Sequence, residues 1–208
     1  MEKTKNINVN LDPVEIFERP PFSNWKESQT TKELVEELTG EVESRLNPRS
    51  IYTIIERKNT DLEKYSPPPL LLECELLVIG ITTIGEEGKK SEYSTSEGFI
   101  VDALENTALS SAYRKTVRMI EEIANERGLK MTRVVSPGSG NIDWETKNQE
   151  FIYKNLEAEK IGIQMTPEKL FNPRKSISFV IGLDKDIKEP KELFSCKGCE
   201  RVDCDYRH

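Results

Sequence analysis

Apolar side chains recur at steps of three and four residues in two long segments, which predicts two amphipathic helices. The first covers residues 28–46 and ends at Asn47-Pro48, since a residue before proline leaves the helical region. The second covers residues 96–127 and stops at Gly128. Its expected inner stripe is Phe99, Ile100, Ala103, Leu104, Ala108, Ala112, Met119, Ile120 and Ile123. Small residues fill the middle of this stripe, so another segment can approach closely there.

Strand patterns lie between these helices and after them. Residues 50–58 alternate and are rich in β-branched side chains, and residues 70–84 form the most apolar stretch of the chain. Shorter strands are expected over residues 129–135 and 174–182. A third helix is expected over residues 144–160, with Asp143 as its N-cap and Gly162 beyond its end.

The order of these elements predicts an α+β fold. Strands and helices do not alternate steadily, and no Gly-x-Gly-x-x-Gly follows a strand, which argues against a doubly wound nucleotide-binding fold. We therefore expect a single domain over residues 28–183, with a mostly antiparallel twisted sheet flanked by helices. Residues 1–27 are expected to form an N-terminal arm with one short strand, and residues 184–208 a charged linker and a Cys-containing tail.

Composition and charge narrow the possible partners. The 208 residues suit one domain, and the hydrophobic fraction of 36% is sufficient for a core despite a mean hydropathy of −0.60. The net charge of −7 and the absence of a Lys/Arg-rich run argue against nucleic acid, which requires a basic footprint. The most apolar stretch contains Glu73 and Glu75 and is too short to span a bilayer. The first residues have no apolar signal core, so we expect a cytoplasmic protein without a membrane partner.

The only histidine is the last residue, His208. The body of the chain therefore has no histidine general base, no Ser-His-Asp or Cys-His pair and no His-rich metal site. Any chemistry must use carboxylates, lysine, tyrosine, cysteine or a cofactor that another molecule provides.

A glycine-rich turn between a predicted strand and a predicted helix is the first candidate site. Its residues are Ser136, Pro137, Gly138, Ser139, Gly140 and Asn141, flanked by Arg133 and Asp143. Free backbone N–H groups in such a turn favour a carboxylate or phosphate. On the local pattern alone, a tight connection with no ligand explains the turn better. Two pairs of like charges, Arg174 with Lys175 and Asp102 with Glu105, are interpreted as solvent-exposed surface.

Three cysteines near the end of the chain are the second candidate site. Cys196, Cys199 and Cys204 have the spacing Cys-x2-Cys-x4-Cys, which suits zinc or an iron–sulfur cluster. The fourth ligand would be Cys74, His208 or a group from a partner. A reversible dithiol or a reduced, unliganded tail explains the same residues equally well.

Several segments within residues 98–182 resemble, in order, the activation domain of vitamin B12-dependent methionine synthase, and especially its short stand-alone versions. Residues 99–103 resemble the opening helix of that domain, and residues 133–140 resemble its Arg-x-x-Pro-Gly-Tyr loop. Residues 160–166 are similar to its Ile-Gly-x-x-Leu-Thr segment, and residues 173–178 to its Pro-x-x-Ser-Val-Ser strand. The cysteine-containing ending is also similar to that of short members.

The resemblance implies an accessory role in the reductive reactivation of a cobalamin-dependent methyltransferase, not an independent catalyst. It implies S-adenosylmethionine at Arg133 and residues 136–141, cobalamin on the partner, and a flavodoxin or ferredoxin as electron donor. Under this reading, the protein supplies position and docking while the cofactors supply the chemistry. The alternatives are a metal- or cluster-bearing electron-transfer or docking protein that does not bind S-adenosylmethionine, and a cofactor-free regulatory module.

Overall fold

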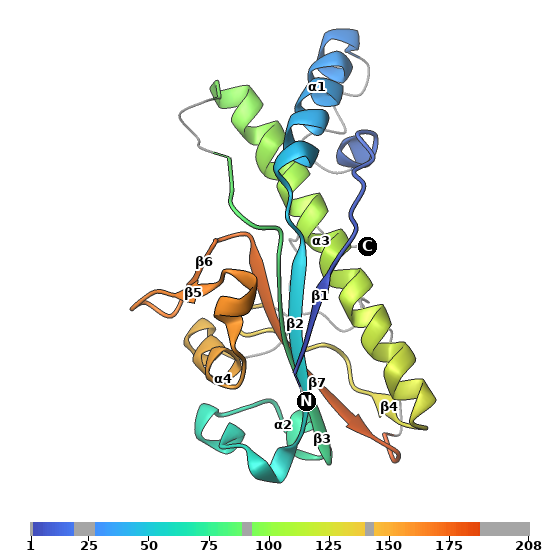
Figure 1. Ribbon diagram of the computed structural model, residues 1–208, viewed down its shortest axis with the longest axis vertical. Coiled ribbons are helices and arrows are strands. Elements are labelled where there is room, and N and C mark those ends of the chain that lie inside the picture. The colour runs from blue at the N-terminus through green and yellow to red at the C-terminus, as the bar shows by residue number, and fades with distance from the viewer. Residues whose placement is uncertain (1, 19–27, 89–92, 140–143, 188–208) are drawn as a thin grey trace.

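The computed structural model describes residues 2–18, 28–88, 93–139 and 144–187. Its centre is a five-stranded sheet in the order β1-β2-β3-β7-β4, in which every neighbouring pair is antiparallel. The strands are β1 (Lys3–Asn6), β2 (Arg49–Glu56), β3 (Leu76–Thr83), β4 (Lys130–Met131) and β7 (Ser176–Asp184). Helices flank this sheet, which confirms the predicted α+β class (Figure 1).

The three central strands are buried on both faces. On one face, Tyr52, Val78 and Phe179 belong to a core cluster shared with the long helix α3 (Thr95–Glu126). On the other face, Ile51, Ile79 and Val180 pack against the helices and turns of the opposite layer. Because successive strand residues point to opposite faces, strands buried on both sides are almost wholly apolar, as β3 is.

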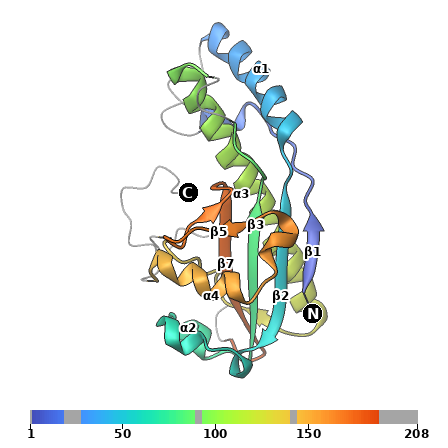
Figure 2. The ribbon, with the colours of Figure 1, turned by 60° about the vertical axis from the view of Figure 1, so that its left-hand side comes forward.

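Helix α3 begins with a capping box in which the Ser94 and Glu97 side chains each bond a backbone N–H at the helix start. It crosses one face of the sheet, and its first half continues beyond the sheet (Figure 2). There it packs beside α1 (Gln29–Arg45) and the short 3-10 helix η1 (Glu15–Glu18). We call α1 and the first half of α3 the helical arm; it has a separate apolar core that includes Val35, Leu38 and Leu104.

The opposite layer is built from short pieces. Helices α2 (Pro69–Leu72) and α4 (Gln149–Lys154) lie there with the 3-10 helices η3 (Arg57–Asn59), η4 (Leu62–Tyr65), η6 (Thr146–Asn148) and η7 (Ala158–Ile161). A two-stranded hairpin, β5 (Gln164–Met165) with β6 (Phe171–Asn172), completes the layer. No helix in the described ranges is both long and apolar enough to cross a membrane.

Three predicted elements differ from the structure. The expected strand over residues 70–84 begins only at Leu76, which is opposite Glu56, the last residue of β2, and Leu183, one residue before the end of β7. Its first residues form α2, with Pro69 at a helix start. The strand over 129–135 is shortened to β4 and a bridge at Val135. The helix over 144–160 is split, because α4 ends where the Asn155 side chain donates to the Phe151 carbonyl at 2.7 Å.

The predicted inner stripe of α3 is confirmed for Ile100, Leu104, Ala108, Ala112 and Ile120, which are buried, while Ala103, Met119 and Ile123 are half-buried. Ala108 and Ala112 are fully buried, as the small-residue pattern predicts. Phe99 was expected inside, but the residue is 62% exposed. The reason is that Phe99 lies on the part of α3 that extends beyond the sheet, where the packed side of the helix carries Ile100, Val101 and Leu104.

Candidate functional site

The segment from β4 to the glycine-rich turn runs along the edge of β7. The Thr132 N–H donates to the Gly182 carbonyl at 2.9 Å, and Val135 exchanges two backbone bonds with Val180 at 2.9 and 2.7 Å. Between these positions the edge segment has two residues, Arg133 and Val134, opposite the single residue Ile181. This is a β-bulge, a device that redirects side chains at a sheet edge.

The turn that follows is closed by its own backbone. The Ser139 N–H and hydroxyl both donate to the Ser136 carbonyl, at 3.1 and 2.7 Å, and the Gly138 N–H donates to the Trp144 carbonyl at 2.7 Å. Gly138 has φ of +79°, and a Cβ there would lie 2.4 Å from Thr146 Oγ1. The sequence predicted free N–H groups here, but those of Gly138 and Ser139 are already used to hold the turn. Gly140, Asn141 and Asp143 lie outside the described residues.

Arg133 is therefore the stronger candidate for an anion. Its side chain is half-buried, and its guanidinium makes no hydrogen bond or ion pair with another residue in the described ranges. A guanidinium is always charged and can bind a carboxylate with two parallel bonds.

Tyr113 joins the turn to α3 and β7. Its ring meets the Phe179 ring edge-on at 5.6 Å between centroids. Its hydroxyl hydrogen-bonds the side chain of Ser136, and burial raises the tyrosine pKa, so the hydroxyl remains protonated at neutral pH. Sequence reasoning missed Tyr113; the available signal was a tyrosine within a stripe of small residues, which alone does not indicate a binding site.

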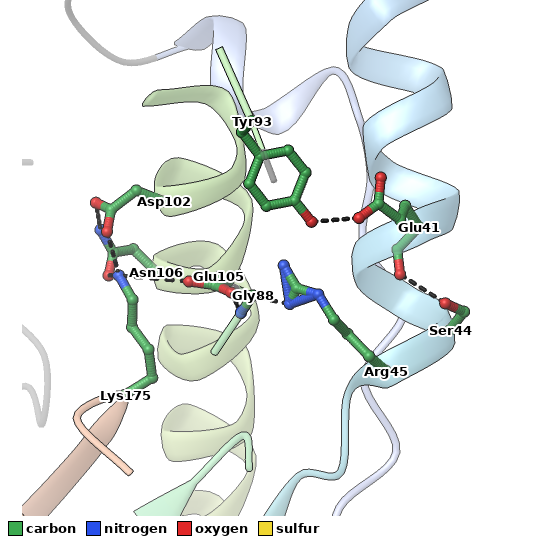
Figure 3. A network of polar contacts seen from close by, with 9 residues as sticks. All are labelled: Glu41, Ser44, Arg45, Gly88, Tyr93, Asp102, Glu105, Asn106 and Lys175. Atoms are coloured by element: carbon green, nitrogen blue, oxygen red, sulfur yellow. Dashed lines mark hydrogen bonds and ion pairs between the residues drawn. The ribbon is translucent and has the colours of Figure 1, made fainter. Parts of the chain in front are cut away.

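A second junction joins α3 to β7 nearer the start of the helix. The Lys175 ammonium, immediately before β7, bonds Asp102 Oδ1 and Asn106 Oδ1 at 2.7 Å each (Figure 3). On the adjacent side of α3, Glu105 Oε1 is 2.9 Å from Arg45 Nη1 and accepts from the Gly88 N–H at 3.1 Å. Burial raises the pKa of Glu105, while that N–H and Arg45 act in the opposite direction.

This junction corrects part of the surface interpretation of the two charge pairs. Arg174 and Asp102 are exposed, as predicted. The side chains of Lys175 and Glu105 are only 12% and 4% exposed, so both belong to the packed interior. Their partners come from segments that are distant in sequence, which a local pattern does not show.

The two junctions enclose a partly exposed strip, which we define as Ser110 on α3 and Ile177 on β7, with Ser136 at its end. Tyr113 and Phe179 close one end of the strip, and Lys175 with Asn106 closes the other. Ser110, Ile177 and Ser136 are each half-buried, so they remain accessible between the closed ends. The strip offers hydroxyls and an apolar side chain, and the Arg133 cation lies past its Phe179 end, on the bulge opposite Ile181.

The predicted metal ligands Cys196, Cys199 and Cys204 lie outside the described residues, and so does His208. Cys74 is buried, and its thiol donates to the Leu70 carbonyl at 3.3 Å. Burial raises the pKa of Cys74 to about 11, which disfavours the thiolate that binds metals. Within the described ranges, no three His, Cys, Asp or Glu side chains gather in an arrangement that could hold a metal ion.

Comparisons with known proteins give a likeness in fold. No model of a known protein family matches the sequence, and no curated protein matches it significantly. The chain is similar to a crystal structure of the MetH reactivation domain bound to AdoHcy, with a TM-score of 0.53 and 15% sequence identity. The match covers 91% of this chain and 80% of the other. The likeness covers most of both chains, so this chain has the fold of that reactivation domain.

Proposed function

We propose that the protein binds S-adenosylmethionine and serves the reactivation of a cobalamin-dependent methyltransferase such as methionine synthase. The observation that carries the proposal is the likeness in fold to a reactivation domain that binds AdoHcy, the demethylated product of that ligand. The partner would be a corrinoid-binding protein, with a flavodoxin or ferredoxin as electron donor.

The site residues agree with this ligand. The carboxylate of its methionine part would bind the Arg133 guanidinium, whose charge no other described residue neutralises. The adenosine part would extend along the strip between α3 and β7, where Ser110 and Ser136 carry hydroxyls and Ile177 offers an apolar contact. The body of the chain needs no histidine for such a role, because it orients the ligand and excludes water.

The chemistry belongs to the bound groups. The corrinoid of the partner would supply the redox chemistry: it would take one electron from the donor and accept the sulfonium methyl group, which would leave S-adenosylhomocysteine on this chain. The protein contributes by holding the sulfonium where the corrinoid of the partner can reach it.

Isothermal titration with S-adenosylmethionine and S-adenosylhomocysteine tests the proposal. Wild-type protein is expected to bind both, and Arg133→Ala is expected to weaken binding by roughly 1.5–3 kcal/mol, the range for a hydrogen bond to a charged group. The matched control is Arg118→Ala, which removes an exposed arginine of α3 and should leave binding unchanged.

Two results would contradict the proposal. If wild-type protein binds neither ligand at millimolar concentration, the proposed function is wrong. If both arginine variants weaken binding equally, the effect is one of general charge, and Arg133 is not the carboxylate contact.

A further inference from the structure

Lys175 is held from two directions. Its carbonyl accepts from the Ile84 N–H at 3.2 Å and from the Thr83 hydroxyl at 3.3 Å, which ties its main chain to the end of β3. Its ammonium bonds Asp102 and Asn106 on α3. One residue therefore connects the sheet directly to the part of α3 that belongs to the helical arm (Figure 3).

The ammonium is also neutralised where it lies. Its Nζ is 2.7 Å from Asp102 Oδ1 and 3.9 Å from Glu105 Oε2, and Asp102 is itself bonded to Asn106 at 3.0 Å. A cation so paired is a poor site for a further anion, because its charge is already balanced. The pairing fits a structural role better, in which Lys175 joins β7 to α3, because breaking a nearly buried ion pair leaves an uncompensated charge.

Lys175 connects α3 to β7 at one end of the strip. From Lys175 to Phe179, β7 advances roughly 13 Å at the rise of an antiparallel strand. From Asn106 to Tyr113, α3 advances roughly 10 Å at the rise of an α-helix. The two runs have similar lengths and are joined at both ends, so they form a closed frame around Ser110 and Ile177.

We infer that Lys175 is a positioning residue for the ligand site: by fastening Asp102 and Asn106 to the start of β7, it sets the separation of α3 and β7 along the strip. The inference rests on the proposed function, because it assigns the strip to the same ligand. Lys175 does not touch that ligand; it acts through Ser110 and Ile177, which line the frame.

The test uses the full chain and S-adenosylhomocysteine as the probe. Lys175→Met keeps the length of the side chain and removes its charge. Lys175→Arg keeps the charge and the donors. The matched control, Lys169→Met, removes an ion pair of the same length, 2.7 Å to Glu150 Oε1, on the hairpin side of the molecule. Amide hydrogen exchange of ligand-free protein is measured at Asn106 and Ile177 for every variant.

For Lys175→Met we expect roughly tenfold weaker binding, in the range for groups coupled through a shared backbone shift, with faster exchange at Asn106 and Ile177. Lys175→Arg should restore both, and Lys169→Met should change neither. Unchanged affinity in Lys175→Met, equal weakening in Lys169→Met, or no rescue by arginine would each overturn the positioning role while leaving the proposed function intact. No binding by wild-type protein would overturn the proposed function, and this inference with it.

Discussion

At the scale of single residues, Glu105 shows how a charge is kept inside the helical arm. It is 3% exposed, yet its carboxylate has the Arg45 guanidinium and the Gly88 N–H within bonding distance. Two further nitrogens of Arg45, Nε and Nη2, are buried without a hydrogen-bond partner in the described chain. Burial removes both charges from water, which costs free energy, and the attraction between the Glu105 carboxylate and the Arg45 guanidinium offsets this cost.

The pH dependence of stability tests which effect dominates at Glu105. Because burial raises its pKa above the usual 4.5, the folded protein holds this proton more tightly than the unfolded chain. The free energy of unfolding of wild type minus that of Glu105→Gln should therefore fall as pH rises from 4.5 to the raised pKa, then level off. Urea unfolding at a series of pH values above 4.5 measures this difference in free energy. Glu36→Gln, on the exposed face of α1, is the control for the loss of one charge. A difference that increases with pH would show that Arg45 outweighs burial.

At the scale of elements, the close packing of β3, β7 and α3 depends on one glycine. Gly80 on β3 is opposite Phe179 on β7, and a Cβ at Gly80 would lie 2.3 Å from Phe179 Cζ. The Phe179 ring fills the space above Gly80 and meets Tyr113 of α3. Glycine generally weakens a strand, but here Gly80 leaves room for the contact between Phe179 and Tyr113 that closes one end of the strip.

Two alanine substitutions separate this packing effect from the general effect of glycine. Gly80→Ala should destabilise the protein by about 1–3 kcal/mol, because the fully buried ring has nowhere to move. Gly40→Ala, in α1 with no atom within 4 Å of the added Cβ, should stabilise it by about 0.5–1 kcal/mol. Chemical denaturation measures both. Equal stability of Gly80→Ala and wild type would mean that the ring relocates without loss.

At the scale of the whole molecule, α3 links two apolar cores. The core of the helical arm lies at its first half, and the core on one face of the sheet lies beside its second half. The strip lies where these parts meet, so its geometry depends on how α3 is held to β7 at both junctions. Cys74 lies between α2 and β3 and is buried beside Gly182 of β7.

The burial of Cys74 leads to a prediction about the candidate metal site formed by the three cysteines near the end of the chain. If the tail binds zinc or iron, changing Cys196, Cys199 and Cys204 to serine should remove the metal from anaerobically purified protein. Cys74→Ser should leave the metal content unchanged, because the buried thiol is a hydrogen-bond donor. Metal analysis of the two variants measures this. Loss of metal in Cys74→Ser would make it a ligand, and metal-free wild-type protein would show that the metal prediction is wrong.

Much of the fold could be predicted from local patterns. The steps of three and four in residues 28–46 and 96–127 predicted α1 and α3, and alternation predicted the central strands. These patterns depend only on neighbours along the chain, which the sequence shows directly. The same is true of Gly138, whose positive φ follows from the local demands of a tight turn, whereas the role of Arg133 stays a prediction.

The tertiary structure decided which of these residues work together. Lys175 and Asp102 are 73 positions apart, and Arg45 and Glu105 are 60 apart, yet each pair is in direct contact. Pairing across such distances is set by strand register and by where α3 crosses the sheet, so no local period encodes it. For the same reason Phe99, apolar and in phase with the inner stripe, lies exposed on the helical arm. Burial is a property of what the rest of the chain places against a residue, and only the folded molecule determines it.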